Sequence, residues 1–346
     1  MGDTLVSISP RDCRAWAQVD ALLEREGIRR DANLDYTCGI VDGDGRLIAT
    51  GSTFGSTLRC CAVDSSHRGE GLLSRIITHL LEHQAERGRH HLFVCTKCQS
   101  AGFFQDMGFH EIARVEGTLS FLENRRSGFA SYCAELAQSR REGSSAVIVM
   151  NANPFTLGHR HLVERAAAEN DWVHLFVLSG DAELIPFDVR WKLVREGVSD
   201  LKNVLCHPGG PYIISAATFP SYFLRDEEAV IRGHARLDLA LFPPIAGALG
   251  ASARYAGEEP RSLVTGIYNQ IMARELPAAG IRCEIIPRLA RNGAAISAGT
   301  VRQWIHDGRL ADIRELVPAA TWNYFNSPEA APVIGAIRES ESVIHY

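Results

Sequence analysis

The chain has 346 residues, which is enough for two domains that each have their own hydrophobic core. Apolar residues make up 46% of the sequence and charged residues 22%, as in an ordinary globular protein, and the formal charge is −5 without a long basic run. This balance argues against a nucleic-acid partner, and the sequence has neither a signal peptide nor an apolar run of the about 20 residues that a membrane span needs. We therefore expect a cytoplasmic protein without a membrane partner.

The first part of the chain, residues 1–122, carries the strand and helix signals of an α/β domain. The expected helices span residues 10–26, 70–87 and 99–107, and the expected strands span residues 36–41, 46–54, 57–63, 91–95 and 109–122. Residues 125–145 are charged and rich in small side chains, and they predict a linker helix, at 126–145, between two domains.

The nine cysteines are an odd number and show no framework spacing, so we expect free thiols. Cys95 and Cys98 have the spacing of a redox or zinc motif, but no second pair completes a zinc site. They follow the apolar run 92–94 at the end of a predicted strand, and we interpret them as structural. Cys60 and Cys61 receive no functional role.

A loop between a predicted strand and a predicted helix contains Arg68-Gly69-Glu70-Gly71. The backbone amides of such a loop, with the helix N-terminus behind it, can hold a pyrophosphate. This segment, together with residues 102–109, where a helix closes on Gly-Phe, resembles the two signatures of the GNAT acyltransferase fold. The resemblance implies a GNAT-like domain at residues 1–125. Leu73 stands where that family usually has a small residue, which would weaken the grip on acetyl-CoA.

The second part, residues 146–346, alternates strand and helix, which favours a Rossmann-like, doubly wound parallel sheet with its ligand at the carboxyl ends of the strands. The expected strands span residues 146–150, 172–178, 203–206, 212–216, 253–256 and 281–286. The expected helices span residues 158–169, 188–199, 220–232, 262–275, 298–307 and 310–317. Pro243 and Pro244, with small-residue neighbours, predict a connecting loop.

The first strand of this second part breaks at the turn 151–154, and a helix follows from about Gly158. Thr156, Gly158 and His159 lie at this junction in the pattern Thr-x-Gly-His. A helix N-terminus offers free N–H groups and a positive dipole end, Gly158 allows a phosphate to approach closely, and His159 can donate to a charged oxygen. The pattern resembles the T/HxGH signature of the nucleotidylyltransferase superfamily, which implies chemistry at the α-phosphate of ATP. His161 falls on a different helix face and is of secondary interest.

A second phosphate-binding pattern lies far downstream, at residues 296–302. This segment, Ile-Ser-Ala-Gly-Thr-Val-Arg, resembles the ISSTxIR motif of the same superfamily. Ser297 is placed to cap a helix that begins at residue 298, so that its hydroxyl and the free amides face one anion. Arg302 would present a permanent cation with planar donors to phosphate.

Residues from other segments are expected to border the same site. They are Gly257 and Glu258 in the loop 257–260; Thr265, Tyr268 and Asn269 on the next helix; Asp188 and Arg190 at the start of another helix; and Arg288 and Arg291 in the loop before Ile296. A strand end that carries Gly, carboxylates and Pro lies at the ligand-binding rim of a parallel sheet. Arg190 is expected to contact the acceptor or the phosphates. The loop arginines could cover a triphosphate, although such arginines are more often simply solvated.

A GNAT-like domain followed by a Thr-x-Gly-His domain resembles the citrate lyase ligase family over nearly the whole chain, most closely at 150–167. The resemblance implies an AMP-forming acid–thiol ligase that activates acetate with ATP and Mg²⁺ and then acetylates the phosphopantetheine-like thiol on the acyl carrier subunit of citrate lyase. It implies no protein ligand for a metal. The implied catalytic residues are Thr156, His159 and Arg302; the implied ATP-binding residues are Asn151, Asn153, Pro154, Phe155, Gly158, Arg190, Gly257, Glu258, Ile296, Ser297 and Thr300; and Arg68, Gly69 and Gly71 are assigned to the prosthetic-group arm.

Two other activities stay open from the sequence. An adenylyltransferase of the pantetheine-phosphate or nicotinamide-mononucleotide type would leave the nucleotide on its product, but the additional domain argues against a plain version of it. A GNAT-type acetyltransferase or a CoA-binding regulator would use only the N-terminal domain. The sequence contains neither a Walker Gly-Lys-Ser/Thr motif nor a GxGxxG that opens a dinucleotide fold.

Overall fold

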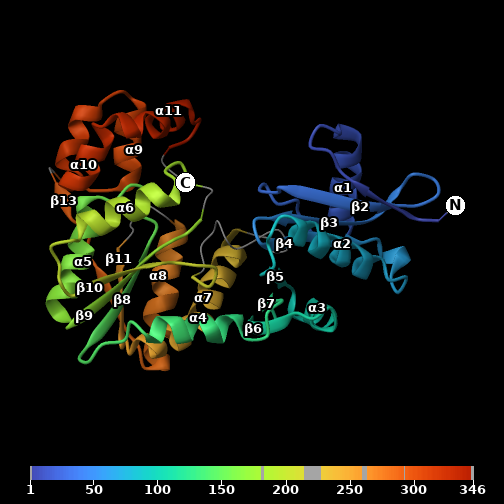
Figure 1. The fold of residues 1–346 in the computed structure, drawn as a ribbon, viewed down its shortest axis with the longest axis horizontal. Coiled ribbons are helices and arrows are strands. Elements are labelled where there is room, and N and C mark those ends of the chain that lie inside the picture. The colour runs from blue at the N-terminus through green and yellow to red at the C-terminus, as the bar shows by residue number, and fades with distance from the viewer. Residues whose placement is uncertain (1, 181–182, 214–226, 259–262, 292, 344–346) are drawn as a thin grey trace. The chain divides into compact units, whose positions relative to one another are not determined.

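The computed structural model describes residues 2–180, 183–213, 227–258, 263–291 and 293–343. The chain divides into two compact units, an N-terminal unit of Met1–Phe129 with Thr218–Ala240 and a C-terminal unit of Ala130–Ala217 with Leu241–Tyr346 (Figure 1). The chain first passes from one unit to the other near the start of helix α4, Gly128–Ala137. Among the described helices, none combines the length and the apolar character needed to cross a membrane.

The N-terminal unit is built on a seven-stranded sheet with the order β1-β2-β3-β4-β5-β7-β6. Its strands are β1 Thr4–Ser7, β2 Tyr36–Val41, β3 Leu47–Phe54, β4 Thr57–Val63, β5 Phe93–Thr96, β6 His110–Val115 and β7 Leu119–Glu123, and its helices are α1 Cys13–Arg25, α2 Leu72–Glu86 and α3 Ala101–Asp106, with 3₁₀ turns η1 Ser65–His67 and η2 Cys98–Ser100. Helix α2 packs its apolar face, with Ile76 and Leu80, against Ile48 of the sheet. The expected α/β class is confirmed for this unit.

Strands β4 and β5 are the one parallel pair of this sheet, and they separate after a short contact. Only Thr57 and Leu58 of β4 pair with Phe93 and Val94 of β5, whereas β4 continues to Val63. The diverging strand ends therefore leave room between them, and the loop that follows β4 leads directly into α2.

Two segments of this unit differ from the sequence prediction. The single strand expected at 109–122 is an antiparallel pair, β6 and β7, because Gly117 with φ of 69° forms a turn between them. Strand β1, Thr4–Ser7, was not expected, because four residues are too few to show a clear alternation; it exists through its pairing with β2.

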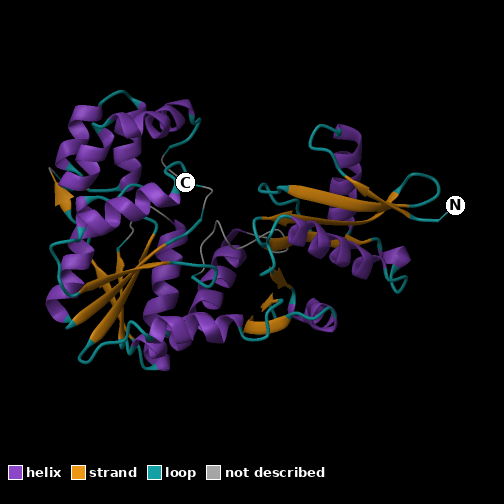
Figure 2. Cartoon of the chain, viewed as in Figure 1, coloured by secondary structure: helices purple, strands orange, loops and turns teal. Residues whose placement is uncertain are grey.

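The C-terminal unit contains a five-stranded parallel sheet with the order β10-β9-β8-β11-β12. Its strands are β8 Ser145–Met150, β9 Trp172–Val177, β10 Val204–Pro208, β11 Ala253–Gly257 and β12 Arg282–Ile286, with a small ribbon of β13 Ala290–Arg291 and β14 Ala294–Ala295. Its helices include α5 Leu157–Glu169, α6 Phe187–Gly197, α8 Leu263–Glu275, α9 Ala298–His306, α10 Ala319–Phe325 and α11 Ala331–Glu339, and helix α7, Glu227–Leu249, enters this unit at Leu241. Figure 2 shows the strands running together with helices on either side of them. The expected doubly wound parallel sheet is confirmed.

The strand order reverses between β8 and β11, which is where ligands bind in open parallel sheets. The first strand of this unit, β8, pairs along its whole length with β9 on one side and through Ala146–Ile148 with β11 on the other. The segments that leave β8 and β11 at their carboxyl ends, which carry the Thr-x-Gly-His pattern and Gly257, therefore meet at one rim of the sheet.

Several C-terminal elements differ from prediction. Pro243 and Pro244 lie inside α7 rather than in a loop, because Phe242 and Ile245 beside them are buried and this packing outweighs the lost backbone bonds. In the strand expected at 212–216, Tyr212 and Ile213 lie in a turn, and residues 214–216 fall outside the described residues. Residues 220–226 of the helix expected at 220–232 also fall outside them. The helix expected at 310–317 is the 3₁₀ segment Leu310–Glu315, and α10 and α11 were not expected.

A pair of histidines is buried between neighbouring strands of this sheet. Nδ1 of His174 on β9 lies 3.0 Å from Nε2 of His207 on β10, and the two residues are 0% and 8% exposed. Burial lowers the pKa of each imidazole to about 4. Both rings are therefore neutral in the folded protein at neutral pH.

We predict that this pair makes the fold sensitive to acid. The pKa of each ring is lower in the folded than in the unfolded chain, so the unfolded chain binds more protons and the free energy of unfolding falls as the pH drops from about 6.5 toward 4. Denaturant unfolding at pH 7 and pH 5 measures this loss. A variant with both His174→Leu and His207→Leu should lose less stability over that interval, and an undiminished loss would contradict the prediction.

Candidate functional site

A cavity of about 580 Å³ lies at the carboxyl ends of β8 and β11, between the N-termini of α5 and α9. This volume is in the range of small-molecule sites in proteins. The sequence-predicted residues that line it are Asn151, Asn153, Thr156, Gly158, His159, Gly257, Ile296, Ser297, Thr300 and Arg302. The structure thus brings the two patterns, which are far apart in the sequence, into one site.

The start of α5 is fixed by a reciprocal cap between Thr156 and His159. The Thr156 hydroxyl accepts the backbone N–H of His159 at 3.3 Å, and the backbone N–H of Thr156 donates to Nδ1 of His159 at 3.1 Å. Because Nδ1 accepts this hydrogen bond, the proton of the neutral ring sits on Nε2. Phe155 stacks on the imidazole with a centroid distance of 5.9 Å and holds it from the core side.

The imidazole of His159 is neutral in this environment. Burial first, and then the positive charges of Arg288 and Arg302, lower its pKa to about 4. Its Nε2–H is therefore a hydrogen-bond donor at neutral pH. This arrangement suits an anionic ligand, because the neutral ring can donate a hydrogen bond from Nε2–H to it without first being protonated.

The second helix N-terminus that borders the cavity is that of α9. Ser297 caps it by accepting the backbone N–H of Thr300 at 3.0 Å, and the two hydroxyls lie 2.8 Å apart. The loop before α9 contacts the start of α5, since a Cβ on Gly158 would lie only 3.1 Å from the carbonyl oxygen of Ile296. Gly158 is thus needed where the two loops touch.

Arg302 lines the cavity, but its guanidinium is also committed to the protein. It is 4% exposed, its Nε donates to the carbonyl of Val343 at 2.7 Å, and its Nη1 donates to the carbonyl of Asn153. Burial lowers its pKa from the usual value. Arg302 therefore ties the turn after β8 to α9 while it adds positive charge beside the cavity.

Arg190 does not lie where the sequence analysis expected it. The structure places it outside the cavity lining, fully buried, with donors to the carbonyls of Asn151, Leu178 and Gly180 and to that of Ile185. It also donates to the Asn151 side chain at 2.9 Å. Its many donors satisfy carbonyls at the ends of β8 and β9, so this arginine positions the rim rather than contacting a ligand.

The remaining predicted residues are distributed around the site. Pro154 and Phe155 are buried behind the cavity, and Glu258 lies beside it with its carbonyl accepting Nε of Arg288 at 2.7 Å. Glu259 and Pro260 of the same loop fall outside the described residues. Asn153 is 3% exposed; its Nδ2 donates to Glu183, and its Oδ1 has no protein partner.

On the acceptor side, the candidates separate into two groups. Thr265 and Arg288 line the cavity. Asn269 donates to the carbonyl of Gly257 at 3.0 Å and so supports the rim, and Arg291 pairs with Glu315 on the surface. Asp188 is at the second position of α6, whose N-cap is Pro186, and Tyr268 lies under Arg254.

Some lining residues were not expected from the sequence, among them Gln303 and Trp304 on α9 and Met150 at the end of β8. His161 on α5, which was of secondary interest, also lines the cavity. Trp304 could have been predicted, because it follows Thr300 by one helical turn and so lies on the same helix face. Met150 could not, because in the sequence a methionine at a strand end resembles any other core residue.

A separate cavity of about 690 Å³ lies in the N-terminal unit, where β4 and β5 separate. The loop residues Arg68, Gly69 and Gly71 line it, with Phe103 and Phe104 of α3. Gly69 and Gly71 have φ of 88° and 72°, which only glycine adopts readily, so the loop geometry depends on them. Leu73 also borders this cavity.

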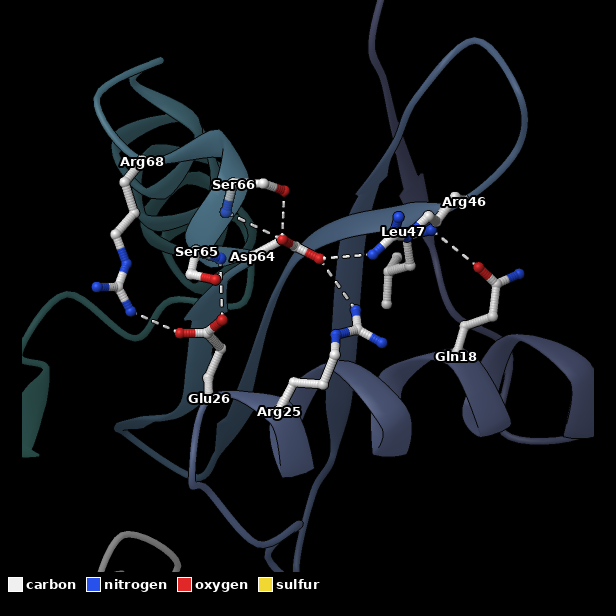
Figure 3. Close-up of polar contacts among 9 residues, drawn as sticks. All are labelled: Gln18, Arg25, Glu26, Arg46, Leu47, Asp64, Ser65, Ser66 and Arg68. Carbon is white, nitrogen blue, oxygen red and sulfur yellow. Dashed lines mark hydrogen bonds and ion pairs between the residues drawn. The ribbon is translucent and has the colours of Figure 1, made fainter.

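Two carboxylates hold this loop against α1 (Figure 3). Glu26 accepts the backbone N–H of Ser65 at 2.9 Å and pairs with Nη2 of Arg68 at 2.7 Å. Asp64 accepts the Ser66 hydroxyl and N–H and pairs with Arg25 and Arg46, and these contacts lower its pKa to about 2. The loop is therefore anchored, and the guanidinium of Arg68 already has one anionic partner.

Residues 145–325 match the family described as "Citrate lyase ligase C-terminal domain". Over a longer span, the chain is 38% identical to the "[Citrate [pro-3S]-lyase] ligase" of Klebsiella pneumoniae, and the alignment covers 88% of this chain and 91% of that one. The similarity thus includes both units.

Solved structures resemble the two units separately. A GNAT-family acetyltransferase from Staphylococcus aureus covers 35% of this chain and 98% of its own, with 11% identity and a TM-score of 0.30. A structure described as a nicotinate-nucleotide adenylyltransferase from Vibrio parahaemolyticus covers 57% of this chain and 96% of its own, with 16% identity and a TM-score of 0.35. These likenesses concern the fold alone.

The contact between Gly158 and Ile296 gives a direct test of the cavity. In Gly158→Ala the added methyl group would press on the Ile296 carbonyl, so the two loops must shift by a few tenths of an ångström. We expect binding of ATP, the ligand that the motifs predict, to weaken about tenfold in calorimetric titration. Gly335→Ala on α11, where a Cβ meets nothing within 4 Å, is the matched control. Unchanged affinity in Gly158→Ala would contradict the assignment.

Proposed function

The chain belongs to the citrate lyase ligase family, and on this premise we propose that it is an AMP-forming acid–thiol ligase that acetylates the acyl carrier subunit of citrate lyase. In the first half-reaction, acetate attacks the α-phosphorus of ATP and diphosphate leaves. In the second, the thiol of the carrier's phosphopantetheine-like group takes the acetyl group and AMP leaves. Acetylation of that thiol activates citrate lyase.

The observation that carries this proposal is the convergence of two capped helix N-termini and a donor imidazole on one cavity. Free N–H groups at the starts of α5 and α9 and the positive ends of both helix dipoles favour a polyphosphate. No carboxylate is found among the described residues that line the cavity. An anionic substrate would therefore meet attraction from several sides, with no opposing charge among these described lining residues.

In the adenylation step, negative charge builds on the oxygens around the α-phosphorus and on the leaving diphosphate. Phosphoryl and nucleotidyl transfer depend mainly on positioning and on donors fixed in advance, with little covalent work for the protein. His159 would donate through Nε2–H, Ser297 and Thr300 through their hydroxyls, and Arg288 through its guanidinium.

Two buried arginines near the cavity, Arg302 and Arg190, would act by position and charge. Arg302 holds the carbonyl of Asn153 beside the cavity, and Arg190 holds the ends of β8 and β9. Both side chains donate hydrogen bonds to carbonyl groups, and these bonds fix the backbone around the turn. The turn 151–154 would thus be rigid and lie in a positive field.

Mg²⁺ would enter with ATP. The described residues contain no group of three or more His, Cys, Asp or Glu side chains placed to hold a metal. The unpartnered Oδ1 of Asn153 is one neutral oxygen that fits such an ion, whose other ligands would be phosphate oxygens and water. When bound, Mg²⁺ neutralises part of the triphosphate charge.

The cavity of the N-terminal unit is our candidate for the prosthetic-group arm. The separated ends of β4 and β5 leave backbone groups unpaired, and an extended pantetheine-like chain carries amides that could pair with them. The loop with Arg68, Gly69 and Gly71 would meet the phosphate end of the arm. Leu73 narrows this cavity near the loop, which fits an arm-binding role better than a tight acetyl-CoA site.

Labelled acetate separates this function from the alternatives. The ligase releases AMP and diphosphate and places label on the carrier thiol, whereas a simple adenylyltransferase does neither with acetate. Tight acetyl-CoA binding without nucleotide binding would instead support an acetyltransferase or a regulator. The assay uses the full chain, ATP, Mg²⁺, acetate and the carrier.

His159→Ala tests the donor at the α-phosphate. We expect acetate-dependent exchange between ATP and diphosphate to fall about 100- to 1000-fold, the usual cost of removing one such donor. The chain should still fold, with a thermal midpoint lowered by only a few degrees, because the ring also completes the cap of α5. His306→Ala, an exposed histidine on α9, is the control. Exchange near the wild-type rate in His159→Ala would remove this residue from the mechanism.

Arg68→Ala tests the arm site. The Arg68 side chain is 68% exposed, and its guanidinium already forms an ion pair with Glu26, so we expect a moderate effect. KM for the carrier should rise about threefold to tenfold, and acetate-dependent exchange should be unchanged. Arg75→Ala, on the first turns of α2 but outside the cavity lining, is the matched control. An unchanged KM in Arg68→Ala, measured by steady-state carrier acetylation, would argue against arm binding in this cavity.

A further inference from the structure

The C-terminal cavity contains few groups that can accept a proton. Among the described residues that line it, the titratable side chains are His159, His161, Arg288 and Arg302. A guanidinium does not give up its proton in proteins, so the two arginines are not bases. Any base among these lining residues is therefore one of two imidazoles.

His159 is already committed as a donor. Its Nδ1 accepts the backbone N–H of Thr156, and the remaining ring proton is on Nε2. The two cationic arginines beside it also disfavour a further proton on this ring. His159 is therefore suited to stabilise phosphate oxygens and unsuited to receive a proton.

His161 has the opposite surroundings. It lines the same cavity, is partly exposed, and has no hydrogen bond or ion pair within the part of the chain that the structure describes. It is carried by a rigid helix, because α5 is capped at Thr156 and packs Leu162 and Val163 into the core. Both ring nitrogens are thus available to a ligand in the cavity.

We propose that His161 is the general base that takes the proton of the acceptor thiol in the acetyl-transfer step. The proposal rests on the proposed function. The S–H proton moves to the imidazole as the sulfur electron pair forms a C–S bond to the acetyl carbonyl carbon. The bond between that carbon and the phosphate oxygen then breaks, and its electron pair leaves with AMP.

A thiol acceptor gives this role a clear chemical reason. The thiolate is the nucleophile, and an alkyl thiol is mostly protonated at neutral pH, since even the thiol of free cysteine has a pKa of about 8.5. A positioned base typically contributes about 100- to 10,000-fold to such a step. Adenylation needs no base, because acetate is already ionised, so His161 would serve only the second half-reaction.

The test compares the two half-reactions in His161→Gln, which keeps a polar side chain but cannot take the proton. We expect acetate-dependent exchange between ATP and diphosphate to stay within about threefold of wild type, and acetylation of the carrier thiol to fall about 100-fold. With thiophenol as acceptor, which is largely ionised without help, the loss should be less than about tenfold. His306→Gln is the matched control and should match wild type in all three assays.

Three outcomes would overturn the proposal: equal losses with the alkyl and aryl thiols, equal losses in both half-reactions, or carrier acetylation at the wild-type rate. Added imidazole should restore carrier acetylation in His161→Ala, and failure to do so would count against a base at this position. If His161→Gln does not fold, the wild-type chain provides the test. A positioned base makes the rate of acetyl transfer depend only weakly on the pKa of the acceptor thiol, so a steep dependence would contradict the proposal. A wild-type chain without acetate-dependent exchange would refute the proposed function instead.

Discussion

The site depends on the contact between the turn that leaves β8 and the segment that begins α9. Gly158 faces the carbonyl of Ile296 so closely that a methyl group has no free space, and Arg302 donates to the carbonyl of Asn153. The start of α5 is tied further to this region, because the N–H of Leu157 donates to the carbonyl of Leu316 at 2.9 Å. These contacts hold two helix N-termini toward the same space. Without them, each would be an ordinary capped helix at a protein surface, and neither alone makes a site for a triphosphate.

The electrostatics of the cavity follow from how its arginines are satisfied. Burying a guanidinium costs free energy unless its donors find acceptors, and Arg190 and Arg302 find them in backbone carbonyls at strand ends and turns. These backbone contacts fix the turn after β8 against α9. The positive charges of Arg302 and Arg288 add to burial in lowering the pKa of His159. In the function that we propose, the same residues would form the rim and attract the polyphosphate.

The sequence predicted the parts of this protein whose signals are local. The strand–turn–helix around Thr156, the Ser297 cap and the loop at Gly71 each depend on a few neighbouring residues, and the structure has all three. The role of Arg190 could not be predicted, because its acceptors lie on loops brought together only by the fold. The helix through Pro243 and Pro244 was missed for a similar reason, since burial of Phe242 and Ile245 overrides a strong local signal. Sequence patterns thus identified residues that the structure brings to one cavity, but they did not say which arginines line that cavity and which hold its rim.

The two imidazoles on the first turns of α5 differ in their hydrogen-bond partners and therefore in the chemical role that we propose for each. His159 and His161 are two residues apart on α5, and both border the cavity, yet the cap at Thr156 occupies one ring and leaves the other open. When two titratable groups share a site and their surroundings push their proton affinities apart, they can act separately as donor and acceptor of protons. Here burial and two arginines keep His159 neutral, and the cap that starts the helix fixes its tautomer. The reaction that we propose, with an anionic first step and a thiol in the second, needs both kinds of group, and in this proposal one helix N-terminus supplies them.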